Sequence, residues 1–284
     1  VFDDKTITAF IKTVKASKID IIELGAIEIT NSDQSGFSIY QNIEQVSKLI
    51  PENKPDDQMY VALFRGPDTP IEDIPKWNPS YCEGIRVIIR YSEIDKSLKF
   101  CRALAEKGYK VFVQPMLTMR YNDNQLQKLI DESNDFGAYA LYLVDSYGYM
   151  ESHDVLNISR RFDEGLLENI CLGFHAHNNM NLAFSNVLNF VEQTSNRSII
   201  VDSTIMGMGQ GAGNIQTELL IPYLNNKNTG AYDYYAVLEA CEIIEAYWKD
   251  NLWGYSVTNL LPAINKTAYK YSSSLRKKKA NKAG

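Results

Sequence analysis

Short β-rich runs alternate with longer stretches of helical periodicity along most of this chain. Apolar residues in segment 4–17 recur on one helical face, and Asp3 or Asp4 is the expected N-cap. A β-rich run over 19–25 follows, and segment 92–107 again carries an apolar stripe of helical period. The pattern therefore predicts strands and helices in alternation, which is typical of α/β proteins.

Seven segments have the composition and length of strands, with centres about 30 residues apart, the length of a βα unit. They are 19–25, 59–64, 85–89, 111–113, 139–144, 172–177 and 199–202. Several of them are apolar on both faces, as parallel strands covered by helices must be. These features predict a (β/α) barrel or a doubly wound sheet, and the absence of a G-x-G-x-x-G motif after the first strand argues against a dinucleotide-binding sheet.

The fold class that we expect is α/β, a TIM (β/α)8-type barrel, which closes with eight strands. After residue 202 the pattern predicts only a glycine-rich loop and two helices, the second over 232–248. Either the first strand is absent from this sequence, before Val1, or the fold is an open seven-stranded variant. We expect a barrel domain over 1–230, bounded near Asn228-Thr229-Gly230, and a closing helix with a C-terminal appendage over 231–284.

Composition places the chain among globular proteins. Its 284 residues are 45% hydrophobic and 23% charged, which argues against disordered, collagenous and disulfide-scaffold classes. No run approaches the roughly 18 apolar residues that span a bilayer, and the first residues lack the features of a signal peptide. The cysteines include no C-x-x-C pair and are expected to be reduced packing residues of a cytoplasmic protein; they are Cys82, Cys101, Cys171 and Cys241.

The charge of the chain is acidic overall, with 35 Asp and Glu against 29 Lys and Arg and a formal net charge of -6. Five cations gather in the tail, at 276–279 and Lys282, which we interpret as a solvated terminus rather than a site for an anionic partner. An acidic body argues against a nucleic-acid partner. The aromatic segment 232–235 and exposed barrel helices are compatible with a homodimer.

Polar residues stand where the predicted strands end, the edge at which barrel enzymes place their functional groups. They are Glu23, Arg65, Arg90, Gln114, Asp145, Ser146, His175, His177, Asp202 and Thr204. We take Glu23 as a candidate catalytic group and Gln114 and Arg90 as candidate substrate-binding groups.

The motif G-F-H-A-H-N places His175 and His177 two residues apart on one strand. Residues i and i+2 of a strand point to the same face, so both imidazoles can bind one divalent metal. The alternative is a pair of hydrogen-bonded structural histidines. The third histidine, His153, lies near Glu151 and Asp154 at a predicted helix start and is expected at the surface.

Two further motifs carry candidate chemistry. The glycine-rich loop 207–214 allows close backbone approach, and Asn214 at its end can serve as a metal ligand or as a helix N-cap. The turn V-D-S-Y-G places Asp145 and Ser146 after a strand, where Asp145 can equally be a loop-capping residue.

Together these motifs resemble the metal-dependent aldolase and lyase family that includes 4-hydroxy-2-oxovalerate aldolase, 3-hydroxy-3-methylglutaryl-CoA lyase and the isopropylmalate-type synthases. The resemblance runs from about residue 4 to 220. It implies that His175 and His177 bind a divalent metal, that Asn214 joins them, and that Asp145 and Ser146 contact the carboxylate of a pyruvate-like 2-keto acid substrate.

The same resemblance makes the tyrosine of the Trp253-Gly254-Tyr255-Ser256 segment a candidate for proton transfer. It also implies a first-strand Asp-Arg pair that cannot be placed in this sequence, and Arg90 stands where the oxovalerate aldolases tend to have histidine. Without the third ligand we expect weaker metal binding and low turnover.

The activity that the resemblance implies is cleavage or formation of a C–C bond next to a 2-keto acid, with release of pyruvate. Two histidines with oxygen ligands suit Mn²⁺ or Mg²⁺, with Co²⁺ or Zn²⁺ as further candidates. The alternatives are an acyl-CoA lyase or synthase of the same family, and a degenerate barrel that acts as a non-catalytic binding module.

Overall fold

The computed structural model describes residues 2–29, 35–193, 197–227, 231–249 and 253–267. The expected boundary at 228–230 and the basic tail at 276–282 lie outside these residues. In the described part of the chain, no helix has the length and apolar character needed to cross a membrane.

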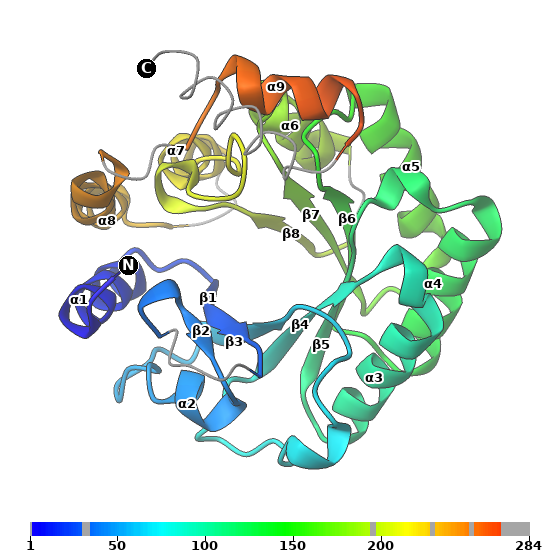
Figure 1. Cartoon of the computed structure of the whole chain (residues 1–284), viewed down its shortest axis with the longest axis horizontal. Helices are drawn as coiled ribbons and strands as arrows, with labels where there is room; N and C mark the ends of the chain where they lie inside the picture. Colours follow the sequence, from blue (N-terminus) through cyan, green and yellow to red (C-terminus); the bar gives the residue numbers. More distant parts are fainter. Residues whose placement is uncertain (1, 30–34, 194–196, 228–230, 250–252, 268–284) are drawn as a thin grey trace, which may run out of the picture.

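Eight parallel strands form one curled sheet in the order β2-β1-β3-β4-β5-β6-β7-β8 (Figure 1). The strands are β1 (Ile21–Ile27), β2 (Ile39–Tyr40), β3 (Met59–Phe64), β4 (Gly84–Ile89), β5 (Lys110–Pro115), β6 (Ala140–Asp145), β7 (Cys171–Ala176) and β8 (Ile199–Asp202). All seven predicted strands are present. The prediction missed β2, which pairs with Ala26 and Ile27 of β1, because two residues are too short to show any alternation.

Most of the helices line the outer face of the sheet (Figure 1). The helices are α1 (Asp4–Ala16), α2 (Ile43–Ser47), α3 (Ile94–Glu106), α4 (Asp123–Asp135), α5 (Ser152–Gly165), α6 (Ala183–Gln193), α7 (Thr217–Asn226), α8 (Tyr234–Trp248) and α9 (Val257–Ile264). Asp3 caps α1 as predicted, its side chain accepting a hydrogen bond from the Thr6 amide at 2.7 Å. Helix α8 packs beside α1 and α7 and buries Val237, Ala240 and Ile244.

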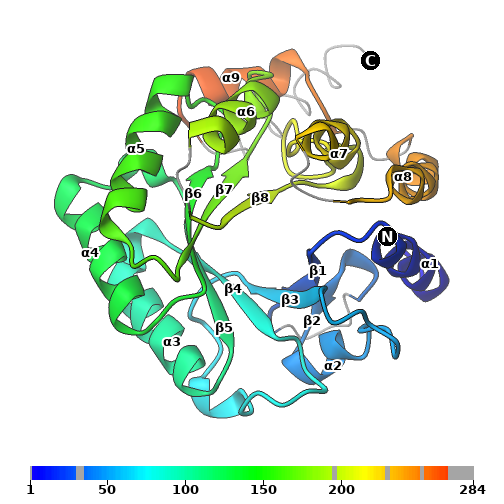
Figure 2. The same ribbon diagram turned by 180° about the vertical axis from the view of Figure 1, so that it is seen from behind.

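The sheet does not close into a complete barrel within the described residues. Strand β8 pairs there with β7 alone, while β1 pairs with β2 and β3, so an opening separates β1 from β8 (Figure 2). Helices α1 and α8 lie beyond this opening. From the seven strands readable in the sequence, the alternatives were a first strand that precedes Val1 or an open fold. A strand before Val1 stays a prediction.

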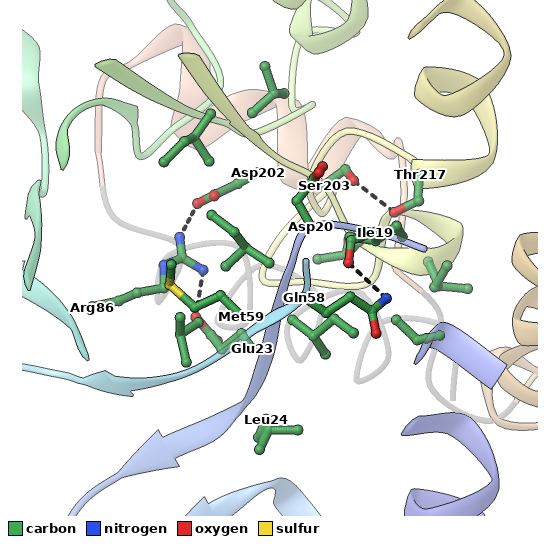
Figure 3. A pocket seen from close by; sticks show the side chains of 18 of the residues that line it. Ile19, Asp20, Glu23, Leu24, Gln58, Met59, Arg86, Asp202, Ser203 and Thr217 are labelled. Atoms are coloured by element: carbon green, nitrogen blue, oxygen red, sulfur yellow. Dashed lines mark hydrogen bonds and ion pairs between the residues drawn. The ribbon is translucent and has the colours of Figure 1, made fainter. Parts of the chain in front are cut away.

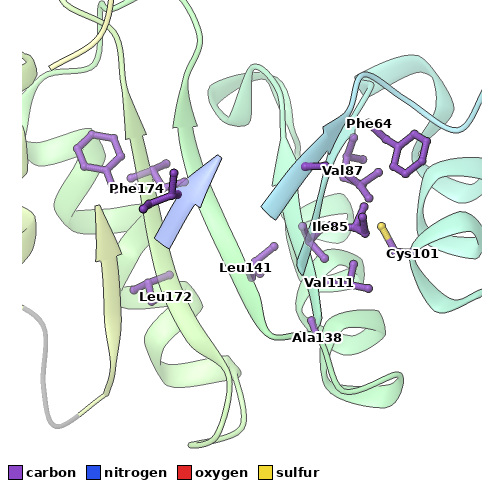
Figure 4. Packing of buried hydrophobic residues seen from close by; sticks show 14 of the residues in the cluster. Phe64, Ile85, Val87, Cys101, Val111, Ala138, Leu141, Leu172 and Phe174 are labelled. Carbon is purple, nitrogen blue, oxygen red and sulfur yellow. The ribbon is translucent and has the colours of Figure 1, made fainter. Parts of the chain in front are cut away.

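Side chains alternate between two hydrophobic layers along each strand, as the period of a β-strand dictates. The outer layer lies between sheet and helices and includes Ile85, Val87, Leu141 and Phe174, all fully buried (Figure 4). The inner layer fills the curl of the sheet with Met59, Val61, Phe112, Ala140, Tyr142, Val144 and Cys171. Both faces of the central strands are therefore covered, which explains their continuous apolar sequences.

Candidate active site

Polar side chains interrupt the inner layer from the middle of the strands to their carboxyl ends, and Glu23, expected where its strand ends, is the third residue of β1. Glu23, Arg86, Gln114, Tyr142, His175 and Asp202 share the inward-facing register of their strands. A cavity of about 940 Å³ extends from this cluster to the opening between β1 and β8 (Figure 3). At the opening, α1 contributes apolar side chains such as Ile7 and Ile11. The cavity is therefore apolar toward the opening and charged toward the inside of the sheet.

Arg86 on β4 joins two carboxylates that lie far apart in the sequence. Its Nη1 donates to Glu23 Oε2 at 2.5 Å, and its Nη2 forms an ion pair with Asp202 (Figure 3). Gln114 lies beside this pair, with its amide oxygen accepting from Arg86 Nε at 2.9 Å in the orientation that satisfies both groups. Burial would raise the pKa of Asp202, but the Arg86 charge and the hydrogen bonds from His175 and Tyr142 outweigh it and lower that pKa.

Sequence reasoning missed Arg86 and Tyr142, and it named Asp202 only as a polar residue at a strand end. Arg86 is the one charged residue within an otherwise apolar strand segment, so its inward register was the available signal. Tyr142 gave no such signal because aromatic residues are common in buried strands. Its ring occupies the inner face because Gly173 beside it has no side chain, and a Cβ there would lie 2.4 Å from the ring.

The two histidines of the H-x-H motif lie side by side, with ring centroids 5.0 Å apart. His175 Nδ1 lies 2.7 Å from Asp202 Oδ2, and His177 Nδ1 lies 2.9 Å from the Asp145 carbonyl oxygen. Because these oxygens only accept hydrogen bonds, each Nδ1 donates, which leaves Nε2 as the ring nitrogen that can bind a metal. Burial, and then the neighbouring His175, lower the pKa of His177 to about 3, so its ring is neutral near pH 7.

Asn214 reaches the same place from the glycine-rich loop. The loop is tied to the histidine motif by a hydrogen bond from the Asn178 amide to the Gly213 carbonyl, 2.8 Å long. Asn214 Nδ2 donates to the Met208 carbonyl at 3.0 Å, while Oδ1 is buried and has no hydrogen-bond partner in the described parts of the chain. The alternative role as an N-cap is wrong, because Gln216 is the N-cap of α7.

The glycines of this loop are required by the space around Asn214. A Cβ on Gly209 would lie 2.5 Å from Asn214 Nδ2, and a Cβ on Gly213 would lie 1.9 Å from the Gly207 carbonyl oxygen. Gly213 also has a φ of +82°, which side chains of L-residues disfavour. The loop can therefore place the asparagine beside the histidines only with glycine at these positions.

These residues fit a divalent metal ion. Two imidazoles whose Nδ1 atoms are held by acceptor oxygens and a buried amide oxygen without a partner form a mixed nitrogen and oxygen donor set. No group of three or more His, Cys, Asp or Glu side chains converges as a metal site among the described residues. The chain would therefore hold such an ion by two histidines and one asparagine.

Asp145 and Ser146 both bind backbone groups of the neighbouring loops. The Asp145 carboxylate is 2% exposed and accepts from the amides of Tyr149 and Met150, each at 3.1 Å, which confirms its loop-capping role. Burial raises the pKa of Asp145 to about 6 although several backbone amides oppose the shift. Ser146 Oγ accepts from the Leu117 amide at 2.8 Å. These two residues shape the turn beneath His177.

Other predicted site residues lie away from the cavity. Arg90 forms ion pairs with Asp68 and, at 3.0 Å, with Glu93. Tyr255 is 57% exposed and precedes α9. Arg65 pairs with Glu28 at 3.1 Å on the exposed surface. The expectation for His153 is confirmed, since its side chain is 67% exposed at the start of α5.

The four cysteines are free, and Cys82, Cys101 and Cys171 are buried, as expected of packing residues. Burial raises the pKa of the Cys82 thiol to about 11, which keeps this group protonated near neutral pH. The cysteines therefore add no reactive thiolate to the site.

Comparison with known proteins identifies similar sequences. The model of the HMGL-like family matches residues 85–245. A 4-hydroxy-2-oxovalerate aldolase of Geobacillus thermodenitrificans (strain NG80-2) is 30% identical over 240 residues, 81% of this chain and 68% of that protein. The corresponding aldolase of Bacillus thuringiensis (strain Al Hakam) is 27% identical over 231 residues, 78% of this chain. The chain spans 65% of the length of this second relative.

Solved structures share the fold. The N-terminal domain of a candidate aldolase from Bacteroides vulgatus aligns with a TM-score of 0.81 and 22% identity, over 96% of this chain and 90% of that one. The hydroxymethylglutaryl-CoA lyase of Pseudomonas aeruginosa aligns with a TM-score of 0.68 and 17% identity, over 87% of this chain and 86% of that one. At these identities the alignments establish a common architecture.

Proposed function

The chain belongs to the HMGL-like family, and we propose that it acts as a divalent-metal-dependent carbon-carbon lyase that cleaves a 4-hydroxy-2-keto acid and releases pyruvate. The observation that carries this proposal is the pair of adjacent His175 and His177 rings, with Asn214 paired to His177 through a β-bridge and its side-chain oxygen unpartnered, beside a cavity that His175 and Asn214 line. The similarity to 4-hydroxy-2-oxovalerate aldolases supports the choice of substrate class.

The donor set suits Mn²⁺ or Mg²⁺, which the two Nε2 atoms and Asn214 Oδ1 would hold. Such an ion would supply Lewis acidity toward the 2-keto group of the substrate, a contribution of several kcal/mol to the barrier. The hydrogen bonds on both Nδ1 atoms hold the rings in the tautomer that this role requires.

Cleavage also needs a group that removes the proton of the 4-hydroxyl. That oxygen becomes the aldehyde carbonyl as the C3–C4 bond breaks, and the electron pair of the bond moves toward the keto group, before C3 takes up a proton to give pyruvate. We assign the proton acceptor to Glu23, which lines the cavity with a side chain 32% exposed and is held in place by Arg86. Ser146 and Gln114 are the proposed substrate-orienting residues, and Tyr255 is the alternative proton-transfer group.

The test measures pyruvate release from a racemic 4-hydroxy-2-keto acid by a coupled assay with the complete chain and added Mn²⁺ or Mg²⁺. We expect turnover that EDTA abolishes and that His175→Ala removes, while His153→Ala, which alters the exposed third histidine, leaves it unchanged. Glu23→Gln should lower turnover far more than Tyr255→Phe. A correctly folded, Mn²⁺-loaded protein that releases no pyruvate would overturn the proposal, and a requirement for a thioester substrate would replace it with the acyl-CoA reaction.

A further inference from the structure

Asp202 lies directly beside His175 because of the strand register. In the parallel pair of β7 and β8, His175 and Asp202 are register partners, so their side chains leave neighbouring strands on the same face. The His175 Nδ1 atom and the Asp202 Oδ2 atom are 2.7 Å apart, and the two side chains are 23% and 13% exposed. This short contact between partly buried groups fixes the plane and the direction of the imidazole ring.

The carboxylate that orients His175 is itself held from two other strands. Arg86 of β4 pairs with it across the inside of the curled sheet, and Tyr142 of β6 donates from its hydroxyl to Asp202 Oδ1 at 3.2 Å. Glu23 of β1 binds the other side of the Arg86 guanidinium (Figure 3). Four strands therefore contribute to a chain of contacts that ends at one histidine nitrogen.

The second histidine is oriented differently. His177 Nδ1 faces a backbone carbonyl, which no side-chain substitution can remove. The orientation of His175 therefore depends on a side-chain carboxylate that can be replaced, whereas the contact that orients His177 is made by the backbone. His177 can therefore serve as an internal reference when the effect of replacing Asp202 on His175 is measured.

We propose that Asp202 is a positioning residue that holds His175 as the Nδ1–H tautomer and presents Nε2 to a divalent metal, with Arg86 and Tyr142 holding the carboxylate in place. The metal part of this inference rests on the proposed function. The tautomer part rests on the hydrogen-bond geometry alone, because a carboxylate accepts hydrogen bonds and donates none. An amide at the same position can present either its oxygen or its NH₂ group, so it does not select the tautomer.

The first test uses Mn²⁺ binding by isothermal titration calorimetry to the complete chain. Loss of a carboxylate that orients a metal-binding histidine typically lowers affinity about 10- to 100-fold, and we expect this for Asp202→Asn. The control is Asp163→Asn, which removes a carboxylate of α5 from another Asp–Arg pair, 2.6 Å from Arg197. This control should bind Mn²⁺ as tightly as the unsubstituted chain.

The second test needs no metal and reports the tautomer directly. With three histidines in the sequence, nitrogen NMR of the ¹⁵N-histidine-labelled protein can be assigned with His175→Ala. We expect a protonated Nδ1 and an unprotonated Nε2 for His175, a mixture of tautomers in Asp202→Asn, and no change for His177. A role of Asp202 in stability alone would leave the His175 signals unchanged in a folded variant.

Separate results overturn the two proposals. An unsubstituted chain that binds no Mn²⁺ contradicts the proposed metal centre, while the NMR result still decides the positioning role. Equal Mn²⁺ affinity of Asp202→Asn and the unsubstituted chain, or an Nε2–H tautomer of His175 in the unsubstituted protein, overturns the positioning role. If Asp202→Asn does not fold, the tautomer in the unsubstituted chain and the Mn²⁺ affinity of Tyr142→Phe, expected to fall by a smaller factor, decide it.

Discussion

The carboxyl group of Asp145 is 2% exposed, and burial raises its pKa to about 6 from a usual value of 3.8. Because the folded chain binds this proton more tightly than the unfolded chain does, protonation of Asp145 stabilises the fold. The contribution is fully present below about pH 3.8 and is lost as the pH rises through 6. Replacement of Asp145 by Asn removes this titration and should therefore change how stability depends on pH.

The size of the effect follows from the two pKa values. A shift of about 2.2 units corresponds to about 3 kcal/mol between the fully protonated and fully ionised limits, at about 1.4 kcal/mol per unit. Between pH 7 and pH 4.5, linkage of the same two values gives about 2 kcal/mol. The free energy of unfolding of the unsubstituted chain should therefore rise by about 2 kcal/mol relative to Asp145→Asn over this interval.

The assay is urea unfolding at several pH values from 4.5 to 7, followed by circular dichroism, for both proteins. Asn also leaves one of the amides of Tyr149 and Met150 without its acceptor, which costs about 1–3 kcal/mol at every pH. The measured quantity is therefore how the difference in free energy of unfolding between the unsubstituted chain and Asp145→Asn changes with pH. The constant cost of the lost hydrogen bond does not affect this change. Ser146→Ala is the control, since it alters the same turn without removing a titratable group and should show a constant difference.

The reasoning would be refuted if the difference in free energy of unfolding between the unsubstituted chain and Asp145→Asn stayed constant from pH 4.5 to 7. A difference that changes in the opposite direction would mean that the four backbone amides outweigh burial and that the carboxylate is the favoured form in the fold. In either case the turn beneath His177 would not contain a destabilised charge.

Two further predictions concern the glycine loop and the core. Gly213→Ala should lower Mn²⁺ affinity in calorimetry. It should also destabilise the chain by more than the roughly 1–3 kcal/mol that a left-handed backbone costs alone, because the new Cβ would meet the Gly207 carbonyl. The control is Gly137→Ala, at a position with a φ of +68° and open space, which should show only the backbone cost and an unchanged Mn²⁺ affinity. Phe162→Ala, at a fully buried position on α5, should cost about 3–5 kcal/mol in urea unfolding, whereas Leu219→Ala, 50% exposed, should cost less than about 0.5 kcal/mol. Equal effects within either pair would contradict these assignments.

Local pattern was sufficient to predict most of the secondary structure. The strands that became β3, β6 and β8 were expected at or within one residue of their observed bounds, because their composition and length are local properties. The short strand β2 escaped, since its two residues pair with β1 only after the chain between them has folded back. Local hydrophobic periodicity cannot reveal a strand pairing made by so few residues.

The parts of the candidate site that depend on local sequence could also be predicted. The histidine motif and the glycine loop are contiguous in sequence, so the proximity of the two rings and the need for glycine around Asn214 could be inferred from local geometry. The position of Arg90 could not, because its ion pair with Asp68 depends on where the segments that follow β3 and β4 meet.

The sequence by itself determined the order of strands and helices, the inward direction of His175 and His177, and the place of the glycines. Only the tertiary structure decided that Arg86 would meet Asp202, 116 residues further along the chain, and that Asp202 would orient His175. The physical reason is the curl of the sheet. It brings the inner faces of distant strands within reach of one another, and this curvature is set by the packing of the whole sheet and its helices rather than by any single segment.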